Sequence, residues 1–396
     1  MSMWSLLLDI GLDDDLEALM AVVQREIQLV ENRRYLYERT QLPTQEKWVH
    51  ILSDTDRFND GFFLRHFRME RDIFWTFEHL MTHRTAFQTV PTQRARAPVP
   101  LQLLTLLKYM GTEGTDGSYS KIGDFLGISC GSVLNFIKRS MTACMEIKDS
   151  VITWPDEEER LLIGDRMESK FGFSKCVGLV DGTLFPLEYK PKSNGEEYYT
   201  RKGNYAINGL VFVDDTSRVR LIMAGYPGSV HDNRVWRNSL PNNNKSDFFS
   251  ADEYLLGDSA FSPSDVMVPA FKKPTKSEMG KYEKFFNNKL AKIRIRTEHA
   301  IGLMKNRFPR LRRIRVRIRD RATMAMIVKQ IIIGAMLHNL LLSEPLPDDV
   351  GHNECDLDEI DVDDDETTDY NDISLMVRGD IKRDDVMAGV LAHFNQ

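Results

Sequence analysis

Apolar residues recur at two different spacings along this chain, and the spacing changes near Lys175. Before that point, apolar positions three or four residues apart predict amphipathic helices, as over Leu16 to Val30 and Phe62 to Met81. Leu101 to Tyr109 predicts a further helix after a linker rich in Pro and Arg. After Lys175 the apolar runs are short and end in turn residues, which predicts strands. A helical part therefore precedes a mixed part.

Two short helices joined by a tight turn are predicted between Ser118 and Met141. Ser118 or Ser120 can cap the first helix, Gly127 can stop it in a left-handed conformation, and Ser129 can cap the second helix. This pattern indicates a helix-turn-helix, although an ordinary helical hairpin has the same signature. If the pair binds DNA, the second helix would present these polar residues: Ser132, Asn135, Lys138 and Arg139.

Four apolar runs predict strands over residues 176–180, 205–213, 219–225 and 254–256. Turn signals between the first three runs indicate antiparallel hairpins. Helices are predicted over about 281–307 and 323–342. Strands followed by helices indicate a mixed α/β domain.

Acidic residues follow two of these runs directly, namely Asp181 and Asp258. If the two strands are neighbours in one sheet, their ends bring the two carboxylates together. Glu298 lies in the helix downstream, and Asp232 lies in a turn after the third run, beside His231. Oxygen ligands of this kind suit Mg²⁺ or Mn²⁺, and such a site can hold two ions that activate a nucleophile and stabilise a leaving oxygen. Taken singly, each Asp could equally belong to an ordinary turn.

The Glu298 helix also carries cations on the same face. Glu298 lies four residues after Arg294, and Lys305 lies seven residues after Glu298, so all three fall near one face of a helix. Arg294 can orient the carboxylate or hold a phosphate, and Lys305 can reach a DNA backbone. The alternative is an exposed helix with an Arg–Glu pair.

Charge is segregated along the chain, which makes the net charge of -7 misleading. Residues 344–372 hold fourteen Asp and Glu and no Lys or Arg, so the rest of the chain carries +7. Residues 289–321 hold thirteen Lys and Arg against two acids. Such a basic block is typical of a protein that binds a polyanion, and equally of a solvated surface.

Two basic segments within this pattern are candidates for DNA contact. Arg310 to Arg321 alternates cations with apolar residues, which predicts an edge strand with a basic face or a nuclear import signal. A Gly-containing loop interleaves aromatic and cationic residues: Lys190, Lys192, Tyr198, Tyr199, Arg201 and Lys202.

Composition excludes several classes of protein. A chain of 396 residues with 42% hydrophobic residues can bury a full core. It has no run of eighteen apolar residues, so no membrane span is expected. Its four Cys residues form no CxxC pair, which argues against a zinc finger and fits a reducing compartment.

Four motifs in this order resemble the PIF/Harbinger transposases, which belong to the DDE superfamily. The motifs are VDGT at 180–183, PGSVHD at 227–232, LLGDSAF at 255–261 and RTEHAIGLMKNRFPRLR at 296–312. The resemblance places the catalytic acids at Asp181, Asp258 and Glu298, and a further metal ligand at Asp232. The spacing of Arg294, Glu298 and Lys305 also resembles a signature of related bacterial transposases, with Ala291 where their Tyr stands.

The resemblance implies an RNase H-like catalytic domain over residues 151–343. A helical region (1–90), a helix-turn-helix domain (91–150) and a largely disordered acidic tail (344–396) are expected around it. The resemblance further implies an enzyme that cuts transposon terminal repeats and joins them to target DNA. Such an enzyme is expected in the nucleus, as an oligomer on DNA and with a Myb-like accessory protein. The alternative is a domesticated DNA-binding or chromatin-associated protein that lacks transposition activity. A phosphatase is disfavoured because Asp181-Gly182-Thr183 lacks a second Asp.

Overall fold

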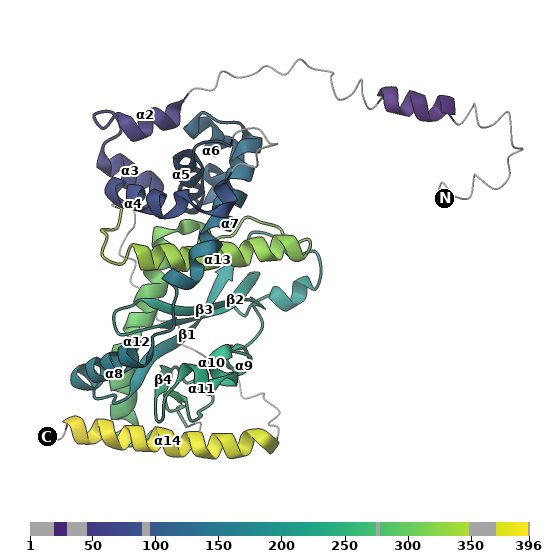
Figure 1. The fold of residues 1–396 in the computed structure, drawn as a ribbon. Helices are drawn as coiled ribbons and strands as arrows, with labels where there is room; N and C mark the ends of the chain where they lie inside the picture. The colour runs from purple at the N-terminus through teal and green to yellow at the C-terminus, as the bar shows by residue number, and fades with distance from the viewer. Residues whose placement is uncertain (1–19, 30–45, 89–95, 275–277, 348–369, 395–396) are drawn as a thin grey trace, which may run out of the picture. The chain divides into compact units, whose positions relative to one another are not determined.

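The computed structural model describes residues 20–29, 46–88, 96–274, 278–347 and 370–394 (Figure 1). It divides the chain into two compact units, Met1–Gln45 and Glu46–Gln396. In the first unit, residues 20–29 form an exposed helix, and the remainder of the predicted Leu16 to Val30 repeat lies outside the described residues. Part of the Pro/Arg linker (89–95) and most of the acidic segment (348–369) also lie outside them.

The N-terminal part of this unit is helical, as predicted. The helices are α2 (Lys47–Ser53), α3 (Asp60–Phe67), α4 (Arg71–Thr82), α5 (Val99–Met110), α6 (Tyr119–Leu126) and α7 (Cys130–Val151), with short 3-10 turns at Thr85–Phe87 and Gly114–Gly117.

The predicted caps of the α6–α7 pair are present. Ser118 accepts a hydrogen bond from the backbone of Lys121, and Ser129 accepts one from the backbone of Ser132. Gly127 ends α6 with a φ of 75°, where a side chain would be strained. Helix α7 continues about ten residues beyond the predicted end, because its inner face stays apolar down to Ile147 and Val151.

The C-terminal part is built on a five-stranded mixed sheet in the order β3-β2-β1-β4-β5. The strands are β1 (Cys176–Pro186), β2 (Ala206–Val213), β3 (Val219–Pro227), β4 (Tyr254–Gly257) and β5 (Met267–Pro269). The β1–β2 and β2–β3 pairs are antiparallel, as predicted, whereas β1–β4 and β4–β5 are parallel. The predicted fold class, an RNase H-like mixed domain with flanking helices, is confirmed.

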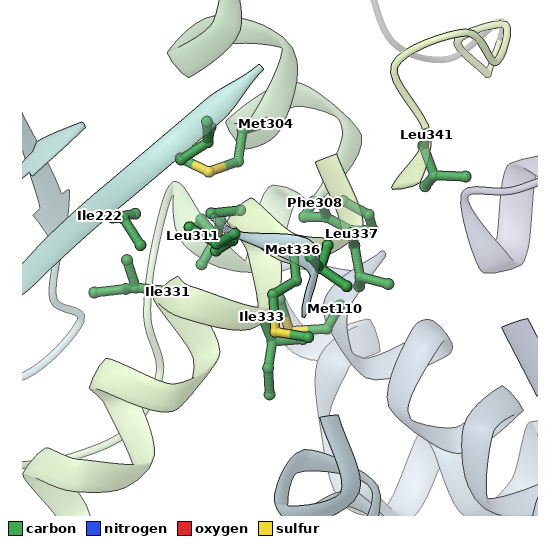
Figure 2. Close-up of a cluster of buried hydrophobic side chains, with 14 of the residues drawn as sticks. Met110, Ile222, Met304, Phe308, Leu311, Ile331, Ile333, Met336, Leu337 and Leu341 are labelled. Atoms are coloured by element: carbon green, nitrogen blue, oxygen red, sulfur yellow. The ribbon is translucent and has the colours of Figure 1, made fainter. Parts of the chain in front are cut away.

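Helices cover this sheet and join it to the helical part. They are α8 (Glu157–Phe171), α9 (Asp232–Arg237), α10 (Leu240–Asn243), α11 (Lys245–Phe248), α12 (Lys281–Arg307) and α13 (Arg321–Leu340). Helix α13 packs on both α7 and β3 (Figure 1). Figure 2 shows the shared core there, where Met110 of α5 lies near Ile333 and Met336 of α13, and Ile222 of β3 lies near Ile331 of the same helix. Burying these side chains in one cluster couples the two parts through the hydrophobic effect.

Helix α13 is long and apolar enough to cross a membrane by length and composition alone, but 56% of its most apolar window is buried inside the protein. It also carries buried polar groups that bond to the sheet. Asn339 bonds to both the backbone N–H and the carbonyl of Val219, and His338 contacts the carbonyl of Ser217. This is the pattern of a core helix.

Two segments match their predictions only in part. Residues 310–321 were expected to form a strand or an extended edge; they begin in the 3-10 turn Pro309–Leu311 and continue as an extended edge with a single bridge, Leu187 to Ile314. The end of the chain was expected to be largely disordered, with a short last helix over Val386 to Phe394; that helix is present, but it begins much earlier and forms α14 over Tyr370–Phe394. Apolar contact stabilises α14 on the body, since Val390 is fully buried and Arg383 lies over the ring of Phe271.

Candidate active site

Strands β1 and β4 carry the first two acids to the same place. The parallel register pairs Leu179 with Leu256, so Asp181 and Asp258, each two residues further on, come level with each other. Strand β1 runs past Asp181 to Pro186, whereas β4 ends at Gly257, immediately before Asp258. The Asp258 residue is 3% exposed, and its carboxylate accepts a hydrogen bond from the backbone N–H of Ala260. The sequence-based expectation that these two strands are neighbours is met.

Asp232 joins them from the first turn of α9. Its carboxylate lies directly over Gly182, and a Cβ at position 182 would stand only 1.9 Å from its Oδ2 atom. A glycine is therefore required beside Asp181 for this approach. The amide Nδ2 of Asn208, in β2, donates to Asp232 Oδ1 at 2.7 Å and to the carbonyl of Val230 at 2.7 Å, which fixes the loop and the carboxylate together.

Helix α12 supplies the fourth acid together with a cation. The guanidinium of Arg294 lies 3.4 Å from Asp181 Oδ2 and 3.7 Å from Glu298 Oε1. The side chain of Glu298 is 25% exposed, so it lies at the mouth of the site rather than beneath it. Arg294 Nε is buried with no hydrogen-bond partner in the structure. The predicted Arg294–Glu298 pair is present, and it reaches Asp181 as well.

Lys305 lies seven residues after Glu298 on α12, and its side chain reaches strand β1 of the sheet. Its Nζ atom donates to Thr183 Oγ1 at 2.6 Å and to the carbonyl of Leu184 at 2.8 Å. It therefore ties α12 to β1 two residues after Asp181. The sequence suggests that Lys305 can reach a DNA backbone, which stays a prediction; in the structure its contacts to β1 give it a positioning role as well.

The pKa values of the acids are raised because the carboxylates are buried and lie near one another. Burial raises the pKa of Asp181 to about 7; Arg294 opposes this rise, while the charges of Asp258, Asp232 and Glu298 add to it. Burial also raises the pKa of Asp232 and the pKa of Asp258, against the Asn208 hydrogen bond in the first case and Arg294 in the second. Negative charge at this point is thus destabilised unless a cation balances it.

The donor set fits a hard divalent cation. All four acidic groups offer carboxylate oxygens, which Mg²⁺ and Mn²⁺ prefer. As arranged, no three His, Cys, Asp or Glu side chains of the described residues are grouped closely enough to hold one ion together. Support for a metal site here comes from the chemistry of the donors, with Asp181 and Asp258 as its base and Asp232 or Glu298 as further ligands.

The predicted DNA-contacting residues fall into two groups. On α7, Asn135 and Lys138 are exposed, but Arg139 donates to Gln102 Oε1 at 2.8 Å and so helps to hold α7 on α5. Near the acids, Arg201 and Lys202 are exposed, and Arg201 lies 3.4 Å from His231 Nε2. His231 is the N-cap residue of α9, immediately before Asp232.

Sequence reasoning missed three residues that shape the site, namely Gly182, Thr183 and Asn208. A signal for Asn208 was available, because it is a lone amide in the otherwise apolar strand AINGLVFV, and buried amides need partners. The roles of Gly182 and Thr183 depend on contacts with α9 and α12, which no local pattern encodes.

Comparison with known proteins gives a family for this domain. Residues 180–339 match the model of the DDE superfamily endonucleases, a span that contains all four acids. The chain is 29% identical over 174 residues to "Putative nuclease HARBI1" of Rattus norvegicus and of Homo sapiens, covering 43% of this chain and 48% of each relative. It is 23% identical over 227 residues to "Protein ALP1-like" of Arabidopsis thaliana, covering 50% of this chain and 55% of the relative. No solved structure gives a significant match.

The chain therefore carries a DDE superfamily endonuclease domain, of a class whose members use divalent metals. Within that superfamily the chain is similar to Harbinger-type proteins, in the order of its motifs and in its match to the HARBI1 and ALP1-like relatives. The chain spans about half the length of the curated relatives it matches.

Proposed function

We propose that this protein is a metal-dependent nuclease that cuts DNA phosphodiester bonds. Its catalytic acids are Asp181, Asp258 and Glu298, and Asp232 is a further ligand. The observation that carries the proposal is the level placement of Asp181 and Asp258 on adjacent parallel strands, with Asp232 and Glu298 brought to them by two helices. The name of the HARBI1 relatives, which describes a nuclease, supports the same reaction.

Each residue has a separate task in this proposal. A divalent cation, when bound, activates the attacking oxygen and stabilises the leaving oxygen of the phosphodiester. Asp181 and Asp258 would hold it with their carboxylates, which the parallel pairing of β1 and β4 keeps level. Asn208 orients Asp232 through its 2.7 Å hydrogen bond. Arg294 keeps the negative charge of Asp181 and Glu298 balanced and can turn to a substrate phosphate.

We further propose two bound ions and joining of the cut end to target DNA. Joining needs the same carboxylates, with a 3′-hydroxyl in place of water as the nucleophile. The four acids supply enough oxygens for two ions. The presence of every acid favours an active enzyme over the alternative of a domesticated DNA-binding protein. The nuclear location, the Myb-like partner and the oligomer on DNA remain predictions from the sequence.

Incubation of the full chain with duplex DNA in Mg²⁺, in Mn²⁺ and in EDTA tests the proposed activity. We expect strand cleavage in either metal and none in EDTA, because the carboxylates alone supply no activated nucleophile. Cleavage that continues in EDTA, or none in either metal, would contradict the proposal. A plasmid excision assay with cognate terminal repeats then separates a transposase from a nuclease that only cuts.

A further inference from the structure

An extended segment after α12 turns a row of arginines toward solvent. The backbone of this segment is anchored: Ile314 N–H donates to the carbonyl of Pro186 at 2.8 Å, and Lys192 N–H donates to the carbonyl of Ile318 at 2.9 Å. Ile314 and Ile318 are buried, at 0% and 8% exposure. Alternate residues of an extended chain point to opposite sides. Arg315 and Arg317, between the two isoleucines, therefore share the outer side with Arg313 and Arg319, which flank them.

Two lysines from the neighbouring segment after β1 complete this surface. Lys190 and Lys192 line a pocket together with Pro191, Arg317 and Arg319. We call the six cations the basic strip: Lys190, Lys192, Arg313, Arg315, Arg317 and Arg319.

Carboxylates neutralise only part of the strip within the described residues. Arg313 pairs with Glu188 and Lys190 pairs with Glu196, whereas Lys192, Arg315 and Arg317 form no ion pair with any described residue. Like charges held this close repel one another, and a polyanion that binds along the row relieves the repulsion.

The spacing of the strip identifies the kind of polyanion. Alternate residues in an extended chain repeat at about 6.6 Å, so the strip offers cations at a regular interval along one line. Arginine forks bind phosphate in a bidentate way. A regular row of phosphates, such as one strand of a duplex, meets these requirements. A folded acidic protein offers no such regular row.

The position of the strip sets the part of the DNA it would reach. The strip begins where β1 ends, and the six residues from Asp181 to Leu187 span at most about 20 Å. The duplex rises about 3.4 Å per base pair, so this distance corresponds to roughly six base pairs. The far end of the strip, at Arg319, extends the reach to about one helical turn.

We propose that the basic strip binds the sugar-phosphate backbone of the substrate duplex, beginning about half a helical turn from the scissile phosphate. This proposal rests on the proposed nuclease function. The strip binds the DNA that flanks the cleavage site without reading its sequence, because contacts to phosphates fix register but carry no base information. The affinity for a substrate therefore depends on how many base pairs extend past the cleavage site on the strip side.

Binding of labelled duplexes to the full chain by fluorescence anisotropy tests this role, with Ca²⁺ in place of Mg²⁺ and a series of salt concentrations. The variant is Arg317→Gln/Arg319→Gln. The matched control is Lys170→Gln/Lys284→Gln, which removes the same charge from exposed positions on α8 and α12. We expect the strip variant to bind a long duplex at least about tenfold more weakly and to lose close to two units of salt slope, at about 0.9 per phosphate contact. The control should stay within about twofold of wild type.

The flank length provides a second comparison. On a duplex cut back to about four base pairs on the strip side, the variant and wild type should bind equally. Equal losses in the variant and the control, a loss that persists on the short duplex, or displacement by polyglutamate as effective as by DNA would each overturn the proposal. Its failure is distinguishable from failure of the nuclease function: strip variants that bind like wild type refute the strip alone, whereas a wild type that binds DNA without cutting it refutes the nuclease alone.

Discussion

The Asp181→Asn variant should lose DNA cleavage by at least about a thousandfold, because it removes the carboxylate at the centre of the acid cluster. Asn has nearly the same shape but offers one neutral oxygen, which holds a divalent cation poorly. A bound cation contributes several kcal/mol to transition-state stabilisation, and each 1.4 kcal/mol is a factor of ten in rate. Single-turnover cleavage of a labelled duplex in Mg²⁺ measures the effect.

DNA binding by this variant should remain within about threefold of wild type, since Asp181 is 14% exposed and contributes repulsion rather than attraction toward phosphate. The matched control is Asp165→Asn, which removes an exposed carboxylate from α8 and should cut normally. Cleavage by Asp181→Asn within about tenfold of wild type would remove Asp181 from the site.

The second large effect concerns stability and pH in the metal-free protein. Burial raises the pKa of Asp181 from 3.8 to about 7, so the folded state binds a proton that the unfolded state releases between these two values. The stability from this group is therefore fully present below about pH 4 and falls as the pH rises toward 7. The pKa difference corresponds to about 4 kcal/mol, with raised pKa values of Asp232 and Asp258 acting in the same direction.

Thermal unfolding in EDTA measures this linkage at pH 5 and at pH 8. Wild type should unfold several degrees lower at pH 8 than the Asp181→Asn variant does. The gap should be smaller at pH 5 and should close only below about pH 4, because the unfolded Asp181 carboxyl, with its pKa of 3.8, still releases its proton at pH 5. Addition of Mn²⁺ at pH 8 should raise the midpoint of wild type, because metal binding favours the deprotonated carboxylates. The Asp165→Asn control should follow wild type throughout. An Asp181→Asn variant that is less stable than wild type at pH 8 would contradict the assigned burial of this charge.

Several elements of the fold could be predicted from local pattern alone. The α6–α7 pair was predictable because Ser118, Gly127 and Ser129 each have a conformational reason to stand at a helix end. Helix α12 was predicted at its observed bounds, Lys281–Arg307, because its apolar positions repeat at helical spacing. Strands β2 and β3 were predictable from apolar runs ending in turn residues.

Other elements depend on partners distant in the sequence. Strand β1 was expected to end at Asp181-Gly182, an ordinary turn signal, but pairing with β2 carries it on to Pro186. Strand β5 has three residues, too few for any periodicity, and it exists because β4 offers it an edge. Helix α14 was underestimated because its sequence is highly charged and its stability comes from contact with the body.

The same division applies to the candidate site. The acids could be nominated from their place after apolar runs and from the order of four motifs. The directions of the cations could not, because Lys305 and Arg139 follow hydrogen-bond acceptors supplied by β1 and α5. Asp232 lies over Gly182 through the tertiary path of the loop after β3, which spacing does not determine.

Crystals of the full chain grown with duplex DNA and Mn²⁺, measured at the manganese absorption edge, test most directly whether these acids share a cation. The account predicts anomalous density at about 2.1 Å from carboxylate oxygens of both Asp181 and Asp258, beside a DNA phosphate. Manganese bound elsewhere, with these two side chains ligating nothing, would contradict it.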